Sequence, residues 1–422
     1  MTSAQPAKHD LPIGHLESCQ ICGASDLQLI VDLGHQPPCD SLLTTAQLRE
    51  EERSYPLRFL RCRTCGLAQI DYVVAPEVLF HAEYPYRSGI TPTLARNLQD
   101  TAKRIASSYA LPEGDLAVDI GSNDGTLLKG FKACGLRVLG VEATNIANIA
   151  VADGIDTIQS FFGLDVAGQI VAKHGRAAAI TATNMFAHVA NLGDMLRGID
   201  HLLRDDGVFV TESHYLLDLL GTLQYDSIYH EHLKFYSIGS LIKLFSYYDF
   251  SVVDAERIPN YGGSIRVYAR KSRNGARSER LSKLIEAEKA AGLDTDRAFL
   301  EFAAKVQKSK LDLLRLLVDL RGCGIAVPGI GCPGRASTLL NYCNIDVDLM
   351  PYIAEQSTSL KLGLFLPGKH IPIVDEQKMF DEQPEYALML SWHYAGPIVQ
   401  ALRARGLKSK LIVPLPDISI VD

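Results

Sequence analysis

The sequence lacks any apolar run that approaches the roughly 20 residues needed to cross a lipid bilayer, which argues against a membrane-spanning protein. It also lacks an excess of basic residues, since the formal net charge is −7, whereas a broad nucleic-acid surface needs a basic patch. The first residues lack the apolar core of a secretory signal peptide, so we expect a cytoplasmic protein whose cysteines are not paired in disulfides. Neither a membrane nor a nucleic acid is therefore expected as a partner.

No fixed-period repeat or low-complexity segment divides the 422 residues, but the composition changes along the chain. A chain of this length suggests about two to four domains. Hydrophobic residues make up 47% and charged residues 22%, as in globular proteins generally. We predict five segments: a mobile tail over residues 1–18, a metal-binding domain over 19–79, an α/β domain over 80–272, a helical connector over 273–321 and a smaller α/β domain over 322–422.

Short apolar segments alternate with helical segments through most of the chain. The central strand candidates are AVDIG, RVLGVEA, AAAITATN and GVFVTES, and the C-terminal ones are GIAVPGIG, MPYIAEQ, HIPIV, YALMLSW and KLIVPLP. Such alternation is typical of a doubly wound, parallel sheet. The predicted fold class is therefore α/β, with a central Rossmann-like sheet and a smaller Rossmann-like unit at the C-terminal end.

Four of the nine cysteines form two CxxC pairs, Cys19 with Cys22 and Cys62 with Cys65, and a glycine follows each pair. Two CxxC turns that face each other supply four thiolates, which complete the coordination of one structural Zn²⁺. A redox pair or unrelated cysteines are the alternative. We interpret the scattered remainder as small apolar residues: Cys39, Cys134, Cys323, Cys332 and Cys343.

An acidic loop with two glycines follows the first central strand in AVDIGSNDGTLLKGF. It is neither GxGxxG nor a P-loop. Its carboxylates repel a pyrophosphate but suit the cationic groups of S-adenosylmethionine, and Glu142 at the end of the next strand can accept hydrogen bonds from ribose hydroxyls. A dinucleotide site, or a turn that only caps a helix, is the alternative. The candidate cofactor-binding residues are Asp119, Gly121, Asn123, Asp124, Glu142 and Asn184.

Ionisable side chains are expected to gather at one edge of the central sheet, because ligands of open parallel sheets bind beyond the carboxyl ends of the strands. The segments that reach this edge are NMFAH at 184–188, TESH at 211–214 and YHEH at 229–232. A single histidine in the first two segments is more often structural, but the dense YHEH run is harder to explain in that way. If this run is extended, Tyr229 and Glu231 point to one side and the two histidines to the other.

Taken together, these motifs resemble those of the sugar C-methyltransferases, of the type that acts on C-3′ of NDP-4-keto-deoxysugars. The matching segments cover nearly the whole chain in family order: the two CxxC pairs, EYPY at 83–86, VDIGSNDGTLL, NMFAHV, YHEHLKFYS, YGGSIRVYAR, TLLNY and LPGKHIPI. The resemblance implies a zinc-binding N-terminal domain, a central class I methyltransferase domain that binds S-adenosylmethionine, and a C-terminal Rossmann-like, substrate-binding domain. It also implies a nucleotide-diphosphate sugar as substrate.

Residue by residue, the resemblance places the catalytic groups at Tyr229, Glu231 and His232, with His188 and either Tyr84 or Tyr86 nearby. His232 would be the base, although His230 and His188 remain possible bases on the residues alone. The ketone acidifies the proton on the adjacent carbon, and a neutral imidazole can remove that proton at physiological pH. A hydrogen-bond donor such as Tyr229 or His188 would stabilise the enolate, which then attacks the sulfonium methyl.

The C-terminal unit departs from the family pattern before TLLNY. It reads GIGCPGRAS, with Arg335 at about the position where the family has a lysine, so the nucleotide and the sugar stay open. YGGS at 261–264 either lets the backbone approach the substrate closely or is a plain β-turn. The candidate substrate-binding residues are Tyr261, Gly263, Ser264, Arg266, Arg335 and Asn341. An O- or N-methyltransferase for another small metabolite, or a non-catalytic nucleotide-sugar-binding protein, is the alternative; the sequence does not give the oligomeric state.

Overall fold

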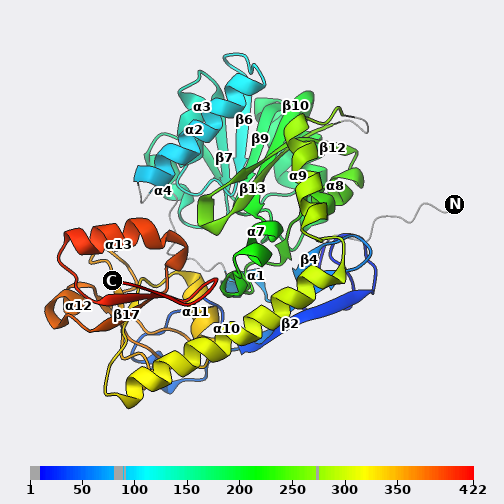
Figure 1. The fold of residues 1–422 in the computed structure, drawn as a ribbon. Helices are drawn as coiled ribbons and strands as arrows, with labels where there is room; N and C mark the ends of the chain where they lie inside the picture. The colour runs from blue at the N-terminus through cyan, green and yellow to red at the C-terminus, as the bar shows by residue number, and fades with distance from the viewer. Residues whose placement is uncertain (1–9, 80–88, 90–91, 272–274) are drawn as a thin grey trace.

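The computed structural model of this chain describes residues 10–79, 89, 92–271 and 275–422. The blue N-terminal unit and the orange-to-red C-terminal unit lie below the cyan-to-green central unit (Figure 1). Tyr84 and Tyr86, which the sequence placed near the catalytic groups, lie outside the described residues. Within the described part of the chain, no helix combines the length and apolar character that a bilayer crossing requires.

The N-terminal unit is built on a four-stranded antiparallel sheet with the order β11-β4-β3-β2. Its elements are β2 Leu27–Gln36, β3 Tyr55–Cys62, β4 Ala68–Ile70 and β11 Lys234–Phe235, with η1 Gln47–Arg49 and α1 Pro76–Leu79 at its loops. The strand β11 comes from the middle of the chain and begins one residue after the YHEH run. The N-terminal sheet is therefore completed by the segment that carries the candidate catalytic residues.

Residues 10–18 differ from the mobile tail that the sequence suggested. Gly14–His15 form β1, which pairs in antiparallel fashion with β5, Tyr72–Val73. Asp10 forms a β-bridge with Asn191 of the central unit. This stretch is too short and too polar for any hydrophobic period to reveal it as a strand.

The central unit is a seven-stranded sheet with the order β12-β13-β10-β9-β6-β7-β8. Its strands are β6 Leu116–Ile120, β7 Arg137–Glu142, β8 Thr157–Gln159, β9 Ala177–Thr183, β10 Leu203–His214, β12 Phe250–Ile258 and β13 Ser264–Lys271. Its helices are α2 Pro92–Ser108, α3 Thr126–Lys132, α4 Ala147–Ala152, α5 Leu164–His174, α6 Leu192–Leu202, α7 Leu216–Gly221 and α8 Ile238–Ser246. The strands β6 to β10 are parallel, while β13 runs antiparallel to both of its neighbours.

Both faces of the central sheet are covered, as a doubly wound fold requires. One hydrophobic cluster joins α2, α3 and α4 to the sheet, and another joins α5, α6 and α8 to its opposite face. Consequently β6 and β9 are buried almost along their whole length, which explains their nearly continuous apolar sequences. The predicted doubly wound α/β fold is confirmed.

The C-terminal unit is a second, smaller α/β sheet with the order β16-β15-β14-β17-β18-β19. Its elements are β14 Gly329–Ile330, β15 Ile353–Glu355, β16 Ile373–Asp375, β17 Tyr386–Met389, β18 Lys410–Val413 and β19 Ser419–Val421, with helices α11 Gly334–Tyr342, α12 Gln377–Glu382 and α13 Ala395–Ala404. All neighbouring strands are parallel except β19, which is antiparallel to β18.

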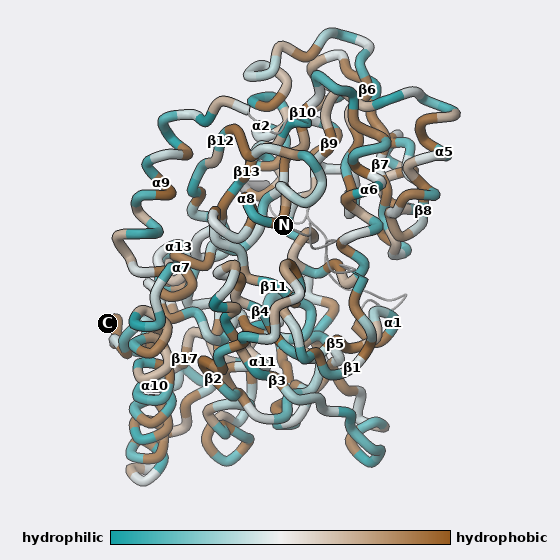
Figure 2. Tube along the Cα trace, turned by 90° about the vertical axis from the view of Figure 1, so that its right-hand side faces the viewer, coloured by the Kyte–Doolittle hydropathy of each residue, from teal (hydrophilic) through white to brown (hydrophobic). Residues whose placement is uncertain are grey.

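Two helices, α9 (Glu279–Ala290) and α10 (Asp296–Gly322), connect the central sheet to the C-terminal unit. Along α10, brown apolar and teal polar segments alternate (Figure 2). Its buried side chains recur every three or four residues, as expected for one packed face: Phe299, Phe302, Val306, Ser309, Leu313 and Leu317. This face belongs to a hydrophobic cluster that extends through the N-terminal and C-terminal units, so α10 packs against both of them.

Candidate active site

The four cysteines of the two CxxC pairs converge on one point. Their sulfur atoms all lie within 4.8 Å of one another, with Cys19 Sγ 3.4 Å from Cys65 Sγ and Cys22 Sγ 3.5 Å from Cys62 Sγ. The glycines that follow the two pairs have φ values of 71° and 76°, which glycine adopts without strain. Four sulfurs at this spacing fit the tetrahedral shell of a structural Zn²⁺ and leave no open position for a substrate.

Gln20, inside the first of these turns, connects the cysteine cluster to the YHEH segment. Its side-chain amide donates to the Leu233 carbonyl oxygen at 3.1 Å. The Leu233 amide donates to the Ala187 carbonyl at 3.1 Å, and Lys234 Nζ donates to the Val189 carbonyl at 2.8 Å. The metal-binding turn thus supports both the YHEH segment and the loop on either side of residue 188.

A cavity of about 690 Å³ opens beyond the carboxyl ends of β6, β7 and β9. Predicted cofactor residues that line it are Asp119, Gly121, Asn123, Glu142 and Asn184. The sixth, Asp124, does not line the cavity. Its carboxylate accepts hydrogen bonds from the Thr126 hydroxyl at 2.6 Å and from the Gly89 amide at 2.9 Å, so it shapes the loop.

The cavity offers acceptors for a cationic ligand. Asn184, at φ 55°, keeps its buried Oδ1 without a hydrogen-bond partner among the described residues, and such an orphaned acceptor suits an ammonium donor. Asp119 accepts a hydrogen bond from the Thr181 hydroxyl at 2.6 Å, yet burial raises its pKa to about 7. A cation beside this carboxyl group would favour its ionised form. These residues therefore fit the ammonium and sulfonium groups of S-adenosylmethionine.

Glu142 is held in a fixed orientation at the end of β7. Its Oε2 accepts from the Asn123 amide at 3.0 Å, and its Oε1 accepts from the Thr144 amide at 2.9 Å and the Thr144 hydroxyl at 2.8 Å. A carboxylate offers about four acceptor positions, so at least one remains for a ribose hydroxyl. Nearby, a Cβ on Gly121 would lie 2.8 Å from Met185 Cγ, which explains the glycine at φ 70°.

The YHEH run forms a turn, and it is not extended. It follows η2 (Tyr225–Ser227), and the His232 amide donates to the Tyr229 carbonyl at 2.9 Å. The turn brings the Tyr229 ring against the His232 ring, with the centroids 4.1 Å apart. An extended chain would have placed these two side chains on opposite sides, so the alternation considered for the sequence does not apply here.

His232 is buried, with 4% of its surface exposed, and its Nδ1 lies 2.8 Å from the Ser227 carbonyl oxygen. Because a carbonyl oxygen can only accept, we assign the ring proton to Nδ1, which leaves a lone pair on Nε2. Burial lowers the pKa of His232 to about 4, although the Ser227 carbonyl opposes this shift. His232 is therefore a neutral imidazole at physiological pH.

Two more histidines from the central sheet pack against His232. The ring centroids of His188 and His214 lie 4.8 Å and 4.9 Å from that of His232. Burial holds the pKa of each well below the ordinary value. His188 also lines the cofactor cavity, so this histidine cluster adjoins the cavity. Burial likewise raises the pKa of Tyr229 well above its ordinary value, which keeps its hydroxyl protonated.

The other two residues of the run face the N-terminal unit. His230 Nε2 lies 3.1 Å from the Pro56 carbonyl oxygen. Its ring packs edge-on against the Tyr55 ring, with the centroids 5.8 Å apart. Glu231 Oε1 accepts a hydrogen bond from the Cys39 thiol at 3.3 Å. Of the three histidines that the sequence left as possible bases, His188 and His232 thus lie together, and His230 is directed toward β3.

Arg335 brings the C-terminal unit next to the histidine cluster. Its Nε lies 3.3 Å from Asp226 Oδ2, and its Nη2 donates to Gln224 Oε1 at 2.9 Å. Asp226 also accepts from Trp392 Nε1 at 2.6 Å, and the guanidinium lies 5.3 Å from the Trp392 ring centroid. The charge of Arg335 adds to burial in lowering the pKa of His232. Arg335 is thus fixed by partners of the central and C-terminal units.

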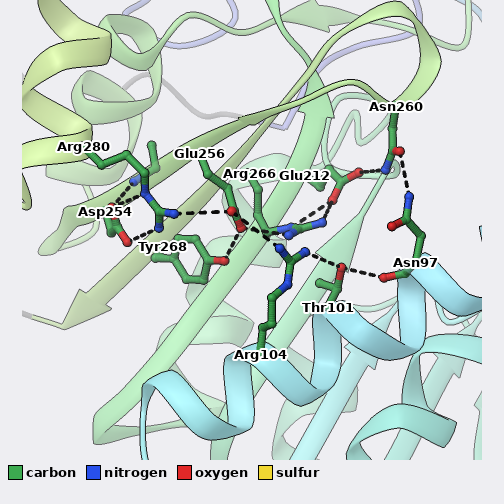
Figure 3. Close-up of polar contacts among 11 residues, drawn as sticks. Asn97, Thr101, Arg104, Glu212, Asp254, Glu256, Asn260, Arg266, Tyr268 and Arg280 are labelled. Carbon is green, nitrogen blue, oxygen red and sulfur yellow. Dashed lines mark hydrogen bonds and ion pairs between the residues drawn. The ribbon is translucent and has the colours of Figure 1, made fainter.

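Arg266 occupies a different place from the cavity lining that a substrate-binding role suggested. Its guanidinium donates to Glu212 Oε2 at 2.7 and 3.0 Å and to Glu256 Oε1 at 2.8 Å (Figure 3). Asn260 extends this network from Glu212 to Asn97 of α2, with distances of 3.2 and 3.1 Å. The network holds β10, β12 and β13 to one another and to α2.

The remaining substrate candidates lie apart from one another. Tyr261, at φ 55° in η3 (Asn260–Gly262), lines the cofactor cavity. Gly263 has a φ of 127° and packs so closely on Asp218 that a Cβ would lie 2.3 Å from Asp218 Cγ. Ser264 Oγ donates to the Asn260 carbonyl, and Asn341 donates to carbonyls of its own unit at 2.9 and 3.0 Å. Of these, only Tyr261 is brought to the cavity.

Three residues in or beside the histidine cluster were not selected from the sequence. His214 ends β10 at the same edge of the sheet, and this position was its only signal. His393 lies in η4 (Trp392–Tyr394) of the C-terminal unit, and Arg335 adds to burial in lowering its pKa to about 3. Asp226, the partner of Arg335, precedes the YHEH run by one short turn. No local pattern connects His393 or Asp226 with the central sheet.

Comparisons with known proteins agree with this arrangement. Three family descriptions match in order: a zinc binding domain at residues 19–80, a methyltransferase domain at 86–255 and a C-methyltransferase C-terminal domain at 259–416. The C-methyltransferase NovU of Streptomyces niveus is 31% identical over 413 residues, which cover 96% of this chain and 97% of NovU.

Two solved structures resemble part of the chain. The CcbJ methyltransferase of Streptomyces caelestis is 12% identical and covers 45% of this chain and 94% of its own, with a TM-score of 0.32. The magnesium protoporphyrin IX methyltransferase of Synechocystis is 11% identical and covers 44% of this chain and 90% of its own, with a TM-score of 0.34. The expected cofactor and the expected structural zinc are confirmed. With a relative matched along almost its entire length, the chain belongs to the C-methyltransferase family of S-adenosylmethionine-dependent enzymes.

Proposed function

We propose that this enzyme methylates the carbon next to the ketone of an NDP-4-keto-deoxysugar, at C-3 of the sugar. The observation that carries the proposal is the environment of His232, a buried neutral imidazole in contact with His188, which in turn lines the cofactor cavity. Carbon methylation needs a base beside the methyl donor, whereas many O- and N-methylations do not. The sequence resemblance to sugar C-methyltransferases supplies the substrate class.

In the proposed mechanism, His232 removes the proton from the carbon next to the ketone. Nε2 accepts this proton because Nδ1 already carries one and donates it to the Ser227 carbonyl. The resulting imidazolium stays hydrogen-bonded through Nδ1. S-adenosylmethionine, held by Asp119, Glu142 and Asn184 when bound, supplies an electrophilic methyl group. The products are the C-methylated ketosugar, S-adenosylhomocysteine and one proton.

The enolate oxygen needs a donor that keeps its proton. Tyr229 meets this requirement, because burial raises the pKa of its hydroxyl and its ring packs against His232. Neutral His188 is a second candidate donor. The positive charge of Arg335, near the cluster, also favours a developing oxyanion, and we assign the C-terminal unit the role of binding the nucleotide part of the substrate.

A panel of NDP-4-ketosugars tests the proposal. Each sugar is incubated with the enzyme and S-adenosylmethionine, and the products are analysed by mass spectrometry and NMR. We expect a gain of one methyl group on the carbon next to the ketone of at least one sugar. A methyl group on oxygen or nitrogen, or no methylated product from any ketosugar, would contradict the proposed substrate class.

A further inference from the structure

The Cys39–Asp40 dipeptide of the N-terminal unit lies where all three units meet. Cys39 Sγ is 3.3 Å from Glu231 Oε1 in the catalytic turn. Asp40 Oδ1 is 3.1 Å from Lys361 Nζ of the C-terminal unit. Lys361 Nζ also donates to the Cys332 carbonyl at 2.8 Å. One dipeptide thus contacts a candidate catalytic carboxylate on one side and a C-terminal loop on the other.

The C-terminal loop that contains Cys332 carries a GxGxxG motif, formed by Gly329, Gly331 and Gly334 between β14 and α11. In dinucleotide-binding folds such a loop lets a diphosphate approach the start of the helix. Here a Cβ on Gly334 would lie 3.1 Å from Asp40 Oδ2 and 3.2 Å from Cys39 Sγ. The glycine therefore allows the Cys39–Asp40 dipeptide to approach this end of α11 closely.

The acidic residue that follows such a motif is also engaged within the chain. Glu355 ends β15, where dinucleotide-binding folds hold a ribose. Its Oε2 accepts from the Cys332 amide of the loop at 2.7 Å, and its Oε1 accepts from the Gln356 amide at 2.9 Å. Glu355 thus holds the glycine loop within the C-terminal unit, whereas Gly334 leaves room for the dipeptide of the N-terminal unit.

The contact between Cys39 and Glu231 has a defined direction. Cys39 is 3% exposed, and burial together with the charges of Glu231 and Asp40 raises the pKa of its thiol well above the ordinary value. A thiol that keeps its proton beside a carboxylate donates to it. Lys361 balances the charge of Asp40, so the cluster of Cys39, Asp40 and Glu231 already has a cation beside it and does not need a metal ion.

We propose that Cys39 is a positioning residue for Glu231, and that the Asp40–Lys361 ion pair holds Cys39 in place. The thiol fixes the orientation of the Glu231 carboxylate, whose proposed role is to orient a sugar hydroxyl or an imidazole. This inference rests on the proposed function only for the role of Glu231 in turnover. The hydrogen bond itself is independent of the substrate.

Cys39→Ala and Cys39→Ser test the proposal as a matched pair, because they differ by one donor group. Hydrogen bonds to charged groups contribute enough to change a rate by roughly tenfold, so we expect Cys39→Ala to lower kcat by roughly tenfold. Cys39→Ser should restore kcat to within about threefold of the wild type, because its hydroxyl also donates. Affinity for S-adenosylmethionine and the melting temperature should stay close to the wild-type values in both variants. Equal kcat values for the two variants would overturn the proposal.

Infrared spectroscopy of the S–H stretching band provides a readout that needs no substrate. The Cys39 band, identified by its loss in Cys39→Ala, should lie at the low wavenumber of a strongly hydrogen-bonded thiol. It should move to higher wavenumber in Glu231→Gln, because a neutral amide is a weaker acceptor than a carboxylate. An unshifted band overturns the proposal even if turnover changes. If the wild type methylates no ketosugar while the band behaves as expected, the proposed function fails and the positioning contact stands.

Discussion

At the scale of single residues, burial determines which groups near the cavity can act as bases and which as donors. His232 and Tyr229 lie in the same turn, yet burial lowers the pKa of the first and raises that of the second. Both shifts favour the neutral form, because removing charge from water is costly. The turn therefore pairs an imidazole able to accept a proton with a phenol able to donate one.

The first prediction concerns pH. The pKa of His232 is lowered to about 4, so the ring is protonated, and inactive as a base, only in acid. We expect kcat/KM to be flat from roughly pH 5 to 7 and to fall as the pH decreases toward about 4. Steady-state kinetics measures this acidic fall in kcat/KM. Circular dichroism confirms that the protein stays folded over the same pH range. A fall in kcat/KM that is centred at about pH 6.5, the ordinary histidine pKa, would show that another group is the base or that the site is hydrated.

A second prediction concerns Glu142. Glu142→Ala removes the proposed ribose acceptor, and a hydrogen bond to a charged group contributes roughly 1.5–3 kcal/mol, so the Kd for S-adenosylmethionine should rise by about tenfold or more. Thr144→Val is the matched control, because it removes one donor to Glu142 but keeps the carboxylate. Isothermal titration calorimetry measures both. An unchanged Kd in Glu142→Ala would place the ribose elsewhere.

Local spacing was enough to predict some of these residues. The CxxC pairs and the cofactor candidates between Asp119 and Glu142 are defined by short-range patterns, and the structure brings each set together. Arg266 shows the limit of such patterns. Its motif suggested a substrate contact, but its partners Glu212 and Glu256 come from neighbouring strands, and strand register cannot be read from one sequence.

At the scale of elements, the segment from η2 through the YHEH turn to β11 shows why tertiary context decides local structure. β11 has only two residues, too few for a period of two to appear in the sequence. It is a strand because it pairs with β4, with Lys234 opposite Gln69. The doubly wound sheet, in contrast, was predictable, because its buried strands give long apolar runs between amphipathic helices.

A third prediction belongs to this element. Gln20→Ala removes the donors to the Ile70 and Leu233 carbonyls, so the YHEH turn should loosen although the four cysteines remain. We expect a lower kcat, faster amide hydrogen exchange at Leu233 and an unchanged Kd for S-adenosylmethionine. One zinc per chain should still be found by metal analysis. Wild-type exchange rates together with wild-type kcat would show that the metal-binding unit does not support the turn.

At the scale of the whole molecule, all three units contribute residues around the YHEH turn. The N-terminal unit supplies Cys39 and the sheet that takes up β11, the central unit supplies His188 and His214, and the C-terminal unit supplies Arg335 and Trp392. The order of the units was predictable from composition and motifs. Their contacts were not, because pairs such as Cys39 with Glu231 join residues far apart in the chain.

In the proposed mechanism His232 removes the proton next to the ketone, and exchange of that proton with solvent can be followed without methyl transfer. The enzyme is incubated with the active NDP-4-ketosugar and S-adenosylhomocysteine in deuterated buffer, and NMR follows deuterium uptake at the carbon next to the ketone. His230→Asn is the matched control, because its ring faces Pro56. We predict uptake with the wild type and His230→Asn, and none with His232→Asn, while His232→Asn still binds S-adenosylmethionine. Uptake or methyl transfer that persists in His232→Asn would show that His232 is not the base.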